Sequence, residues 1–129
     1  MDKPSLHIAT IDELDTIRQL GRQTFLESFA KDNTVNDISQ YVDDAFSRDQ
    51  MAKELSNAES EFYLASIENR PIGYLKVNFG EAQTEKHDKN AVEIERIYVV
   101  GDYQGKQVGK LLFDKAFEIA KARKATYLW

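Results

Sequence analysis

The sequence predicts a single α/β domain, and three observations lead to that class. The chain has 129 residues, a length typical of one domain with its own hydrophobic core. Segments with the β-branched composition of strands alternate along it with segments of helical periodicity. One stretch, residues 91–124, combines a strand, a short turn and a helix without interruption. We therefore expect residues 1–129 to form one domain.

The other elements are organised around residues 91–124. The first part, AVEIERIYV, is rich in β-branched residues, which favours a strand. The last part, LLFDKAFEIAKARK, predicts a helix because its apolar residues recur at helical spacing and Lys and Arg gather near its end. The intervening turn, VGDYQGKQVGK, should therefore lead directly into a helix N-terminus.

This turn has features of a diphosphate site. Backbone N–H groups at a helix N-terminus have no intrahelical partner, and the helix dipole favours an anion there. Gly105 and Gly109 let a ligand approach the backbone closely, while Lys106 and Lys110 add positive charge. The phosphate-binding patterns GxxxxGK[ST] and GxGxxG are both absent. A plain helix start with two permissive glycines is the alternative interpretation.

The N-terminal half predicts one short strand and three helices. The strand is expected at 6–10, and Thr10 or Asp12 can cap a helix over about 11–29. A second helix should begin near residue 34. A third should begin at Ser47, where Gln50 stands at capping-box spacing.

The centre of the chain predicts a hairpin. Strands are expected at 61–68 and 72–79, joined by a turn at Asn69-Arg70-Pro71. Residues 80–90 are polar apart from Ala82, so we expect an exposed, mobile loop. Residues 125–129, ATYLW, should begin a further strand.

Composition excludes several classes of function. The net charge of −5 and the lack of a basic stripe argue against nucleic acid as a partner and suit a cationic one. No apolar run is long enough to cross a membrane, and no signal pattern is present, so a cytoplasmic location is expected. Cysteine is absent, and His7 and His87 lie far apart, which predicts no metal site and two surface histidines.

Residues 104–109, Gln-Gly-Lys-Gln-Val-Gly, resemble the Q/R-x-x-G-x-G/A motif of the GNAT superfamily of N-acetyltransferases. Gln107 stands at the family's middle glycine, where a non-glycine residue can still donate its N–H if its conformation is helical. The resemblance implies acetyl-CoA as co-substrate. The motif residues that would bind it are Gln104, Gly105, Lys106, Gln107, Val108, Gly109 and Lys110.

The order of strands and helices resembles the first part of the GNAT fold, which has a mixed sheet. In that family the fourth and fifth strands run parallel and splay apart around the cofactor. A family member continues beyond the fifth strand, whereas this sequence stops within it, at Trp129. An unfinished sheet edge invites pairing, so a homodimer is compatible with the sequence.

The family resemblance also implies roles on the strand before the turn. Glu95 lies nine residues before Gln104, where comparable members carry a general base. The alternative is a solvated carboxylate, or one paired with Arg96 or a lysine; Glu93 is a lesser candidate. The backbone of Ile97, Tyr98 and Val99 would pair with the pantetheine arm. The tyrosine acid of the family lies beyond this sequence, so we predict that the chain as given lacks normal turnover.

Residues 24–55 resemble bacterial spermidine/spermine N-acetyltransferases of the PaiA type, which implies a small amine, above all a polyamine, as substrate. In the family the first two helices form much of the acceptor wall. Carboxylates attract a polycation and aromatic faces hold ammonium groups, so the candidate substrate-binding residues are Phe25, Phe29, Tyr41 and Glu27. The alternative is that the acids are exposed helix faces and the aromatics are core.

Three other functions stay open at this point. The first is acetylation of a protein N-terminus or lysine. The second is a non-catalytic acyl-CoA-binding or regulatory module, and the third is an interaction domain without a ligand.

Overall fold

The computed structural model describes residues 3–29, 35–85, 88–105 and 107–129, and side chains throughout these ranges except at residue 29 and residues 35–39. A four-stranded antiparallel sheet has the order β1-β2-β3-β4. The strands are β1 (Ser5–Ile8), β2 (Ser60–Ile67), β3 (Arg70–Phe79) and β4 (Val92–Val99). The expected elements of the α/β class are thus present.

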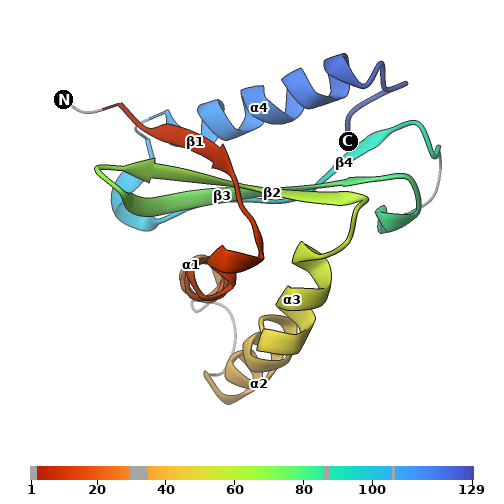
Figure 1. The fold of residues 1–129 in the computed structure, drawn as a ribbon. Helices are drawn as coiled ribbons and strands as arrows, with labels where there is room; N and C mark the ends of the chain where they lie inside the picture. Colours follow the sequence, from red (N-terminus) through yellow and green to blue (C-terminus); the bar gives the residue numbers. More distant parts are fainter. Residues whose placement is uncertain (1–2, 30–34, 86–87, 106) are drawn as a thin grey trace.

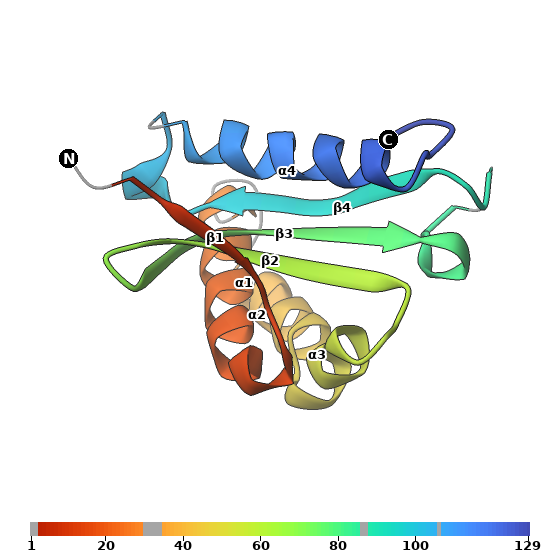
Figure 2. The same ribbon diagram turned by 45° about the horizontal axis from the view of Figure 1, so that its top comes forward.

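Helices cover both faces of this sheet. The 3₁₀ helix η1 (Ile11–Glu13) leads into α1 (Leu14–Phe29), and α2 (Val35–Ala45) and α3 (Arg48–Leu55) follow. These helices lie on one face, and α4 (Val108–Ala122) lies on the other (Figure 1). Figure 2 shows the four strands side by side between these two layers.

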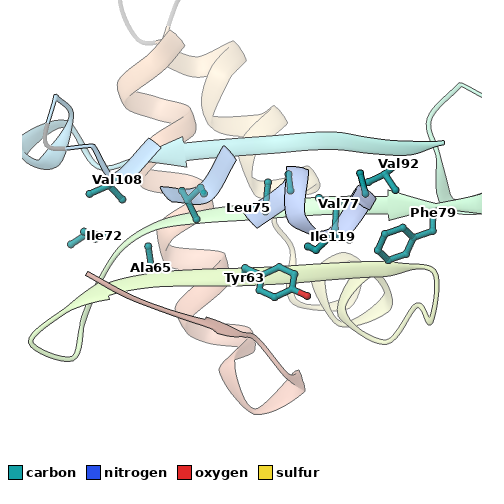
Figure 3. Close-up of a cluster of buried hydrophobic side chains, with 12 residues drawn as sticks. Tyr63, Ala65, Ile72, Leu75, Val77, Phe79, Val92, Val108 and Ile119 are labelled. Carbon is teal, nitrogen blue, oxygen red and sulfur yellow. The ribbon is translucent and has the colours of Figure 1, made fainter. Parts of the chain in front are cut away.

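Each face of the sheet has its own hydrophobic core. The core beneath α4 includes Leu75, Val77 and Phe79 of β3 with Val108, Leu112 and Ala116 of the helix (Figure 3). The opposite core joins α1, α2 and α3 to Phe62, Leu64 and Tyr74 of the sheet. Because successive strand side chains point to opposite faces, β3 contributes to both cores and is buried continuously from Ile72 to Phe79.

Local signals place two helix starts as expected. Ser47 precedes α3, and its hydroxyl accepts a hydrogen bond from the backbone N–H of Gln50 at 3.2 Å. Thr10 precedes η1, and the Glu13 carboxylate accepts from the Thr10 N–H at 3.2 Å. The same Glu13 pairs with the exposed His7 at 2.7 Å, which confirms His7 as a surface residue. His87 lies outside the described residues.

The hairpin turn differs from the prediction. It is formed by Glu68 and Asn69, both with positive φ, of 51° and 65°, while Arg70 and Pro71 already belong to β3. Two consecutive residues with positive φ match the twist of a two-residue hairpin, so no third turn residue is needed.

The expected exposed loop over residues 80–90 is instead partly fixed to the fold. It begins with the 3₁₀ helix η2 (Gly80–Ala82), and Gln83 is only 4% exposed. The Gln83 amide donates to the backbone oxygens of Gly80 and Asp88 and accepts from the indole N–H of Trp129 at 2.8 Å.

The segment 125–129 runs alongside β4 in the parallel direction. Leu128 forms a parallel bridge with Val92. The N–H groups of Val92 and Ile94 donate to Tyr127 and Trp129 at 3.0 and 2.7 Å, and the Trp129 N–H donates to Val92 at 3.0 Å. The sheet is therefore mixed at this edge, as expected for the fold.

Candidate active-site cleft

An open cleft lies between α2, α3 and β4. It has a volume of about 410 Å³ and is lined by Tyr41, Asp44, Ala45, Gln50, Glu54, Glu95 and Arg96. Two sequence-predicted residues, Tyr41 and Glu95, therefore share one cleft although 54 positions of the chain separate them. The carboxylate of Asp44 and the exposed ring of Tyr41 suit a cationic ligand.

A bulge in β4 places Glu95 at this cleft. Ile94 pairs with Val77 and Arg96 pairs with Lys76, so Glu95 is an extra residue with no partner in the register. Its carboxylate accepts from the Asn78 amide at 2.9 Å and lies 2.8 Å from the Lys76 ammonium and 3.2 Å from the Arg96 guanidinium. The ion-paired carboxylate considered from the sequence is thus observed at the cleft wall, where a catalytic role remains a prediction.

The surrounding cations determine the charge of Glu95. Burial by itself raises its pKa, but the hydrogen bonds from Lys76 and Asn78 and the charges of Lys76 and Arg96 outweigh burial and hold the pKa below its usual value. Glu95 is therefore ionised at neutral pH.

Glu93 has a different environment. It is 4% exposed, and its carboxylate accepts hydrogen bonds from the Asn78 amide and from the backbone N–H and hydroxyl of Thr84. It is not among the residues lining the cleft. Its contacts stabilise the segment after β3.

Glu54 is a cleft residue that the sequence reasoning missed. Its carboxylate lies 2.8 Å from Lys76 and 3.0 Å from Arg96, and it accepts from the Gln50 amide at 2.8 Å. Burial raises the pKa of Glu54, but Arg96, Lys76 and Gln50 together lower it by more. The net shift of the pKa is therefore downward. The helical spacing of Gln50 and Glu54 was the only local signal, because both cations come from distant strands.

The predicted substrate residues separate into different places. Tyr41 is 58% exposed at the cleft, and its ring stacks on Phe25 at 5.2 Å between centroids. Phe25 is half-buried against the core beneath α1–α3. Glu27 lies near the end of β4, where it accepts from the backbone N–H of Gly101 at 3.0 Å. The side chain of Phe29 lies outside the described residues.

Asp44 is the exposed carboxylate of the cleft. It lies one helical turn from Gln40, whose amide donates to both of its oxygens at 3.2 and 3.3 Å. The neighbouring Asp43 instead pairs with Arg22. Asp44 is therefore the described acid of α2 that faces the cleft.

The turn before α4 is open to a ligand. A Cβ added at Gly105 or Gly109 would have nothing within 4 Å, and Gly105 has a φ of +81°. Val108 is buried in the core and fixes the first turn of α4, whose exposed Lys110 pairs with Asp114 at 2.8 Å. Lys106 lies outside the described residues. An open space above a helix N-terminus suits an anionic ligand.

Gln107 departs from the conformation considered in the sequence analysis. Its φ and ψ are 66° and 13°, which is left-handed rather than the right-handed helical geometry that we considered. A glycine adopts this geometry freely, so Gln107 retains the backbone shape of the glycine that it replaces. The nearby Gln104 is exposed, and its amide donates to the Val99 carbonyl at 3.1 Å.

The outer edge of β4 is only partly paired. On the inner side, Ile97, Tyr98 and Val99 pair with Leu75, Tyr74 and Gly73 of β3. The outer bridge found in the described part of the chain is at Val92, near the start of the strand. The edge beside Ile97–Val99 therefore lies between the cleft and the turn, where an extended ligand can add to the sheet.

The described ranges hold neither a group of metal-ligating side chains nor a membrane-spanning helix. Those residues contain no group of three or more His, Cys, Asp or Glu side chains able to hold a metal ion. None of their helices has both the length and the apolar character needed to span a membrane.

Comparisons with known proteins identify the family. The acetyltransferase (GNAT) family model matches residues 22–129. The chain is 34% identical over 110 residues to an uncharacterized N-acetyltransferase from Lactobacillus delbrueckii subsp. lactis, which covers 85% of this chain and 64% of that relative. The chain thus spans less than two thirds of the relative's length.

Solved structures share the fold. The PaiA N-acetyltransferase from Thermoplasma acidophilum, solved with coenzyme A, matches with a TM-score of 0.82 and 20% identity over 95% of this chain and 75% of its own. An aminoglycoside acetyltransferase from an uncultured soil metagenomic sample matches with a TM-score of 0.73 and 17% identity, over 98% and 78% of the respective chains. With the family match over residues 22–129, these comparisons show that the chain belongs to the acetyltransferase (GNAT) family.

Proposed function

We propose that the protein is an acetyl-CoA-dependent N-acetyltransferase that acetylates a primary amine of a small molecule, with a polyamine as the leading substrate. The observation that carries this proposal is the position of Glu95 at the wall of the cleft that holds Asp44 and Tyr41, on the strand that leads to the open turn before α4. Family membership supports the same chemistry. The resemblance to PaiA favours a polyamine, whereas the likeness to an aminoglycoside acetyltransferase makes an aminoglycoside a further candidate substrate.

Acetyl-CoA would supply the acetyl group. Gly105, Gln107, Gly109 and the N-terminus of α4 would hold its phosphates, and the edge at Ile97–Val99 would pair with its pantetheine arm. Lys110 would add positive charge, and Gln104 and Val108 shape the turn.

The amine would enter from the cleft. Asp44 and the face of Tyr41 would hold a cationic part of the substrate, while Glu95, directly or through water, would take the proton of the reacting ammonium. The neutral nitrogen then forms the C–N bond as the C–S bond breaks. The amide nitrogen loses a second proton, and the thiolate gains one to leave as CoA thiol, so one proton is released overall.

A non-catalytic acyl-CoA-binding module is the second candidate. It is favoured by one observation: the Glu95 carboxylate already has Lys76, Asn78 and Arg96 as partners. Acetylation of a protein terminus or lysine, a homodimer and a cytoplasmic location stay predictions.

Calorimetric titration with acetyl-CoA, followed by a transfer assay with spermidine, tests the proposal. We expect the unchanged chain to bind acetyl-CoA and Gly109→Trp to lose binding while keeping its circular dichroism spectrum, because the indole fills the open space at the turn. Gly21→Ala, in the core away from the turn, is unsuitable as a control because its Cβ would lie 2.5 Å from the Phe46 ring. Lys121→Trp, at the exposed end of α4, is the matched control and should keep binding.

The outcomes separate the candidates. Binding with acetyl transfer to spermidine supports the enzyme. Binding without transfer to spermidine, aminoglycoside or peptide amines, even in a chain extended past Trp129, supports the binding module, and absence of binding contradicts both.

A further inference from the structure

Lys76 is a buried charged residue behind the cleft wall. It lies in the centre of β3, is 5% exposed, and is not among the residues that line the cleft. Burying an ammonium is unfavourable unless paired groups compensate for the lost hydration. Its partners therefore indicate why it is tolerated there.

Two carboxylates share the Lys76 ammonium. Glu54 Oε1 and Glu95 Oε1 each lie 2.8 Å from Nζ. The Phe62 ring, with its centroid 5.5 Å from Nζ, lies on another side and offers a cation–π contact. Lys76 thus links α3 to the bulge of β4 from behind the cleft wall.

The position of Glu95 depends on this link. As the unpaired residue of a bulge, it has no opposite neighbour in β3 to define its side chain. Its Oε1 contacts Lys76 and Asn78 in the sheet, while Oε2 lies 3.2 Å from Arg96, a cleft residue. One end of the carboxylate is therefore held from behind, and the residue remains on the cleft wall.

We propose that Lys76 is a positioning residue for Glu95: its buried ammonium holds the carboxylate ionised at the cleft wall and sets the lower pH limit of acetyl transfer. This inference rests on the proposed function, because it assigns a supporting group to the proposed base. Lys76 itself does not touch the amine.

Several titratable groups face or influence Glu95 from the elements packed around it. They are Lys76 and Tyr74 of β3, Arg96 of β4, Glu54 of α3, and Asp44 and Tyr41 of α2. Glu93 shares the Asn78 amide with Glu95. Lys76 and Arg96 are the cations in direct contact, so removal of either should favour protonation of Glu95, and removal of an acid should oppose it.

The first experiment is a carboxyl ¹³C NMR titration of the 129-residue chain, with the Glu95 signal assigned by its loss in Glu95→Gln. In the unchanged chain the Glu95 midpoint should lie below 4.5, the ordinary value for a glutamate. In Lys76→Met it should rise by about 1–3 pH units, the usual effect of losing a close opposite charge. Lys76→Arg should restore most of the shift, and the exposed Lys53→Met should leave it unchanged.

The second experiment is the pH profile of kcat/KM for acetyl transfer to spermidine in the same variants. The acid limb should move upward in Lys76→Met with the Glu95 midpoint and return in Lys76→Arg, whereas a purely structural lysine would lower the rate equally at every pH. An ordinary Glu95 midpoint in the unchanged chain overturns the proposal even if Lys76→Met fails to fold. An unmoved midpoint or acid limb in the folded variant also overturns it.

Failure of the proposed function gives a different result. In that case the chain transfers no acetyl group at any pH, even when it is extended past Trp129, whatever the NMR titration shows for Glu95.

Discussion

Lys76 and Arg96 stand directly opposite each other in the pairing of β3 and β4, although both are cations. Like charges opposite each other in a sheet repel. Glu54 compensates for this repulsion, since one oxygen of its carboxylate lies 2.8 Å from Lys76 and 3.0 Å from Arg96. A residue of α3 therefore makes this strand pairing tolerable.

Glu54→Gln should consequently destabilise the fold. The amide cannot balance two buried cations, and breaking a buried ion pair costs about 3–5 kcal/mol. Because Glu54 lines an open cleft, we expect a loss of roughly 2–4 kcal/mol in the free energy of unfolding. Urea unfolding at pH 7 measures the change. Glu118→Gln, which removes an exposed carboxylate of α4, is the control and should change stability by less than about 0.5 kcal/mol. Equal effects of the two substitutions would contradict the role given to Glu54.

Stability should fall steeply in acid. The pKa values of Glu54 and Glu95 are both below the usual 4.5: burial raises them, but their contacts with Lys76 and Arg96 more than compensate. A lowered folded-state pKa adds stability above the unfolded-state pKa, and this is lost as pH falls through the folded values. Urea midpoints should therefore decline below about pH 4.5, and less steeply in Glu95→Gln. A decline equally steep in that variant would show that other groups dominate acid unfolding.

Gln107→Gly should stabilise the protein. Gln107 has a φ of 66°, and a side chain in the left-handed region costs about 1 kcal/mol that glycine does not incur. The gain should reach roughly 1 kcal/mol at most, because glycine also loses more conformational entropy on folding. Thermal unfolding compares this variant with Gln107→Ala, which keeps the strained φ and should gain nothing. A gain in the alanine variant would indicate that the glutamine side chain, rather than its backbone, is unfavourable.

Tyr74→Phe should be neutral or stabilising. Tyr74 is fully buried, and its hydroxyl has no hydrogen-bond partner within the described residues. An unpartnered buried hydroxyl costs about 1–3 kcal/mol, part of which the phenylalanine recovers. Burial also raises the Tyr74 pKa, so the hydroxyl is neutral.

The matched control for this change is Tyr63→Phe. The Tyr63 hydroxyl donates to Glu61 at 2.8 Å, so its loss should cost about 0.5–1.5 kcal/mol. Chemical denaturation of both variants gives the comparison, and a loss in Tyr74→Phe equal to that in Tyr63→Phe would mean that Tyr74 has a partner.

Local patterns were sufficient to predict most of the fold. The Ser47–Gln50 cap, the apolar stripe of α4 and the strand–turn–helix order depend on neighbours within a few residues, and each is present. The turn at Glu68 and Asn69 was misplaced because Pro71 is a strong turn signal. Pro71 instead lies at the start of β3, opposite Ser66 at an irregularity in the register, where a proline is tolerated in a strand.

The cleft was harder to predict because its parts come from distant segments. Glu95 and Tyr41 were found through a family resemblance and residue type, but Glu54, Lys76 and Arg96 meet only when α3 packs across β3 and β4. The bulge places Glu95 at the cleft, but the alternation of side chains along the sequence of β4 does not indicate it. Gln83 likewise looks like an ordinary loop residue until Trp129 lies beside it.

The continuous burial of β3 from Ile72 to Phe79 has a consequence for how this protein can diverge. Even-numbered side chains from Tyr74 to Asn78 lie toward the cleft and odd-numbered ones support α4, so almost any replacement in this strand disturbs one layer or the other. Under the proposed function, new amine preferences are expected to arise by changes at exposed helical positions of the cleft such as Tyr41, Asp44 and Gln50. Substitutions are therefore expected to be tolerated better in the helices of the cleft than in β3.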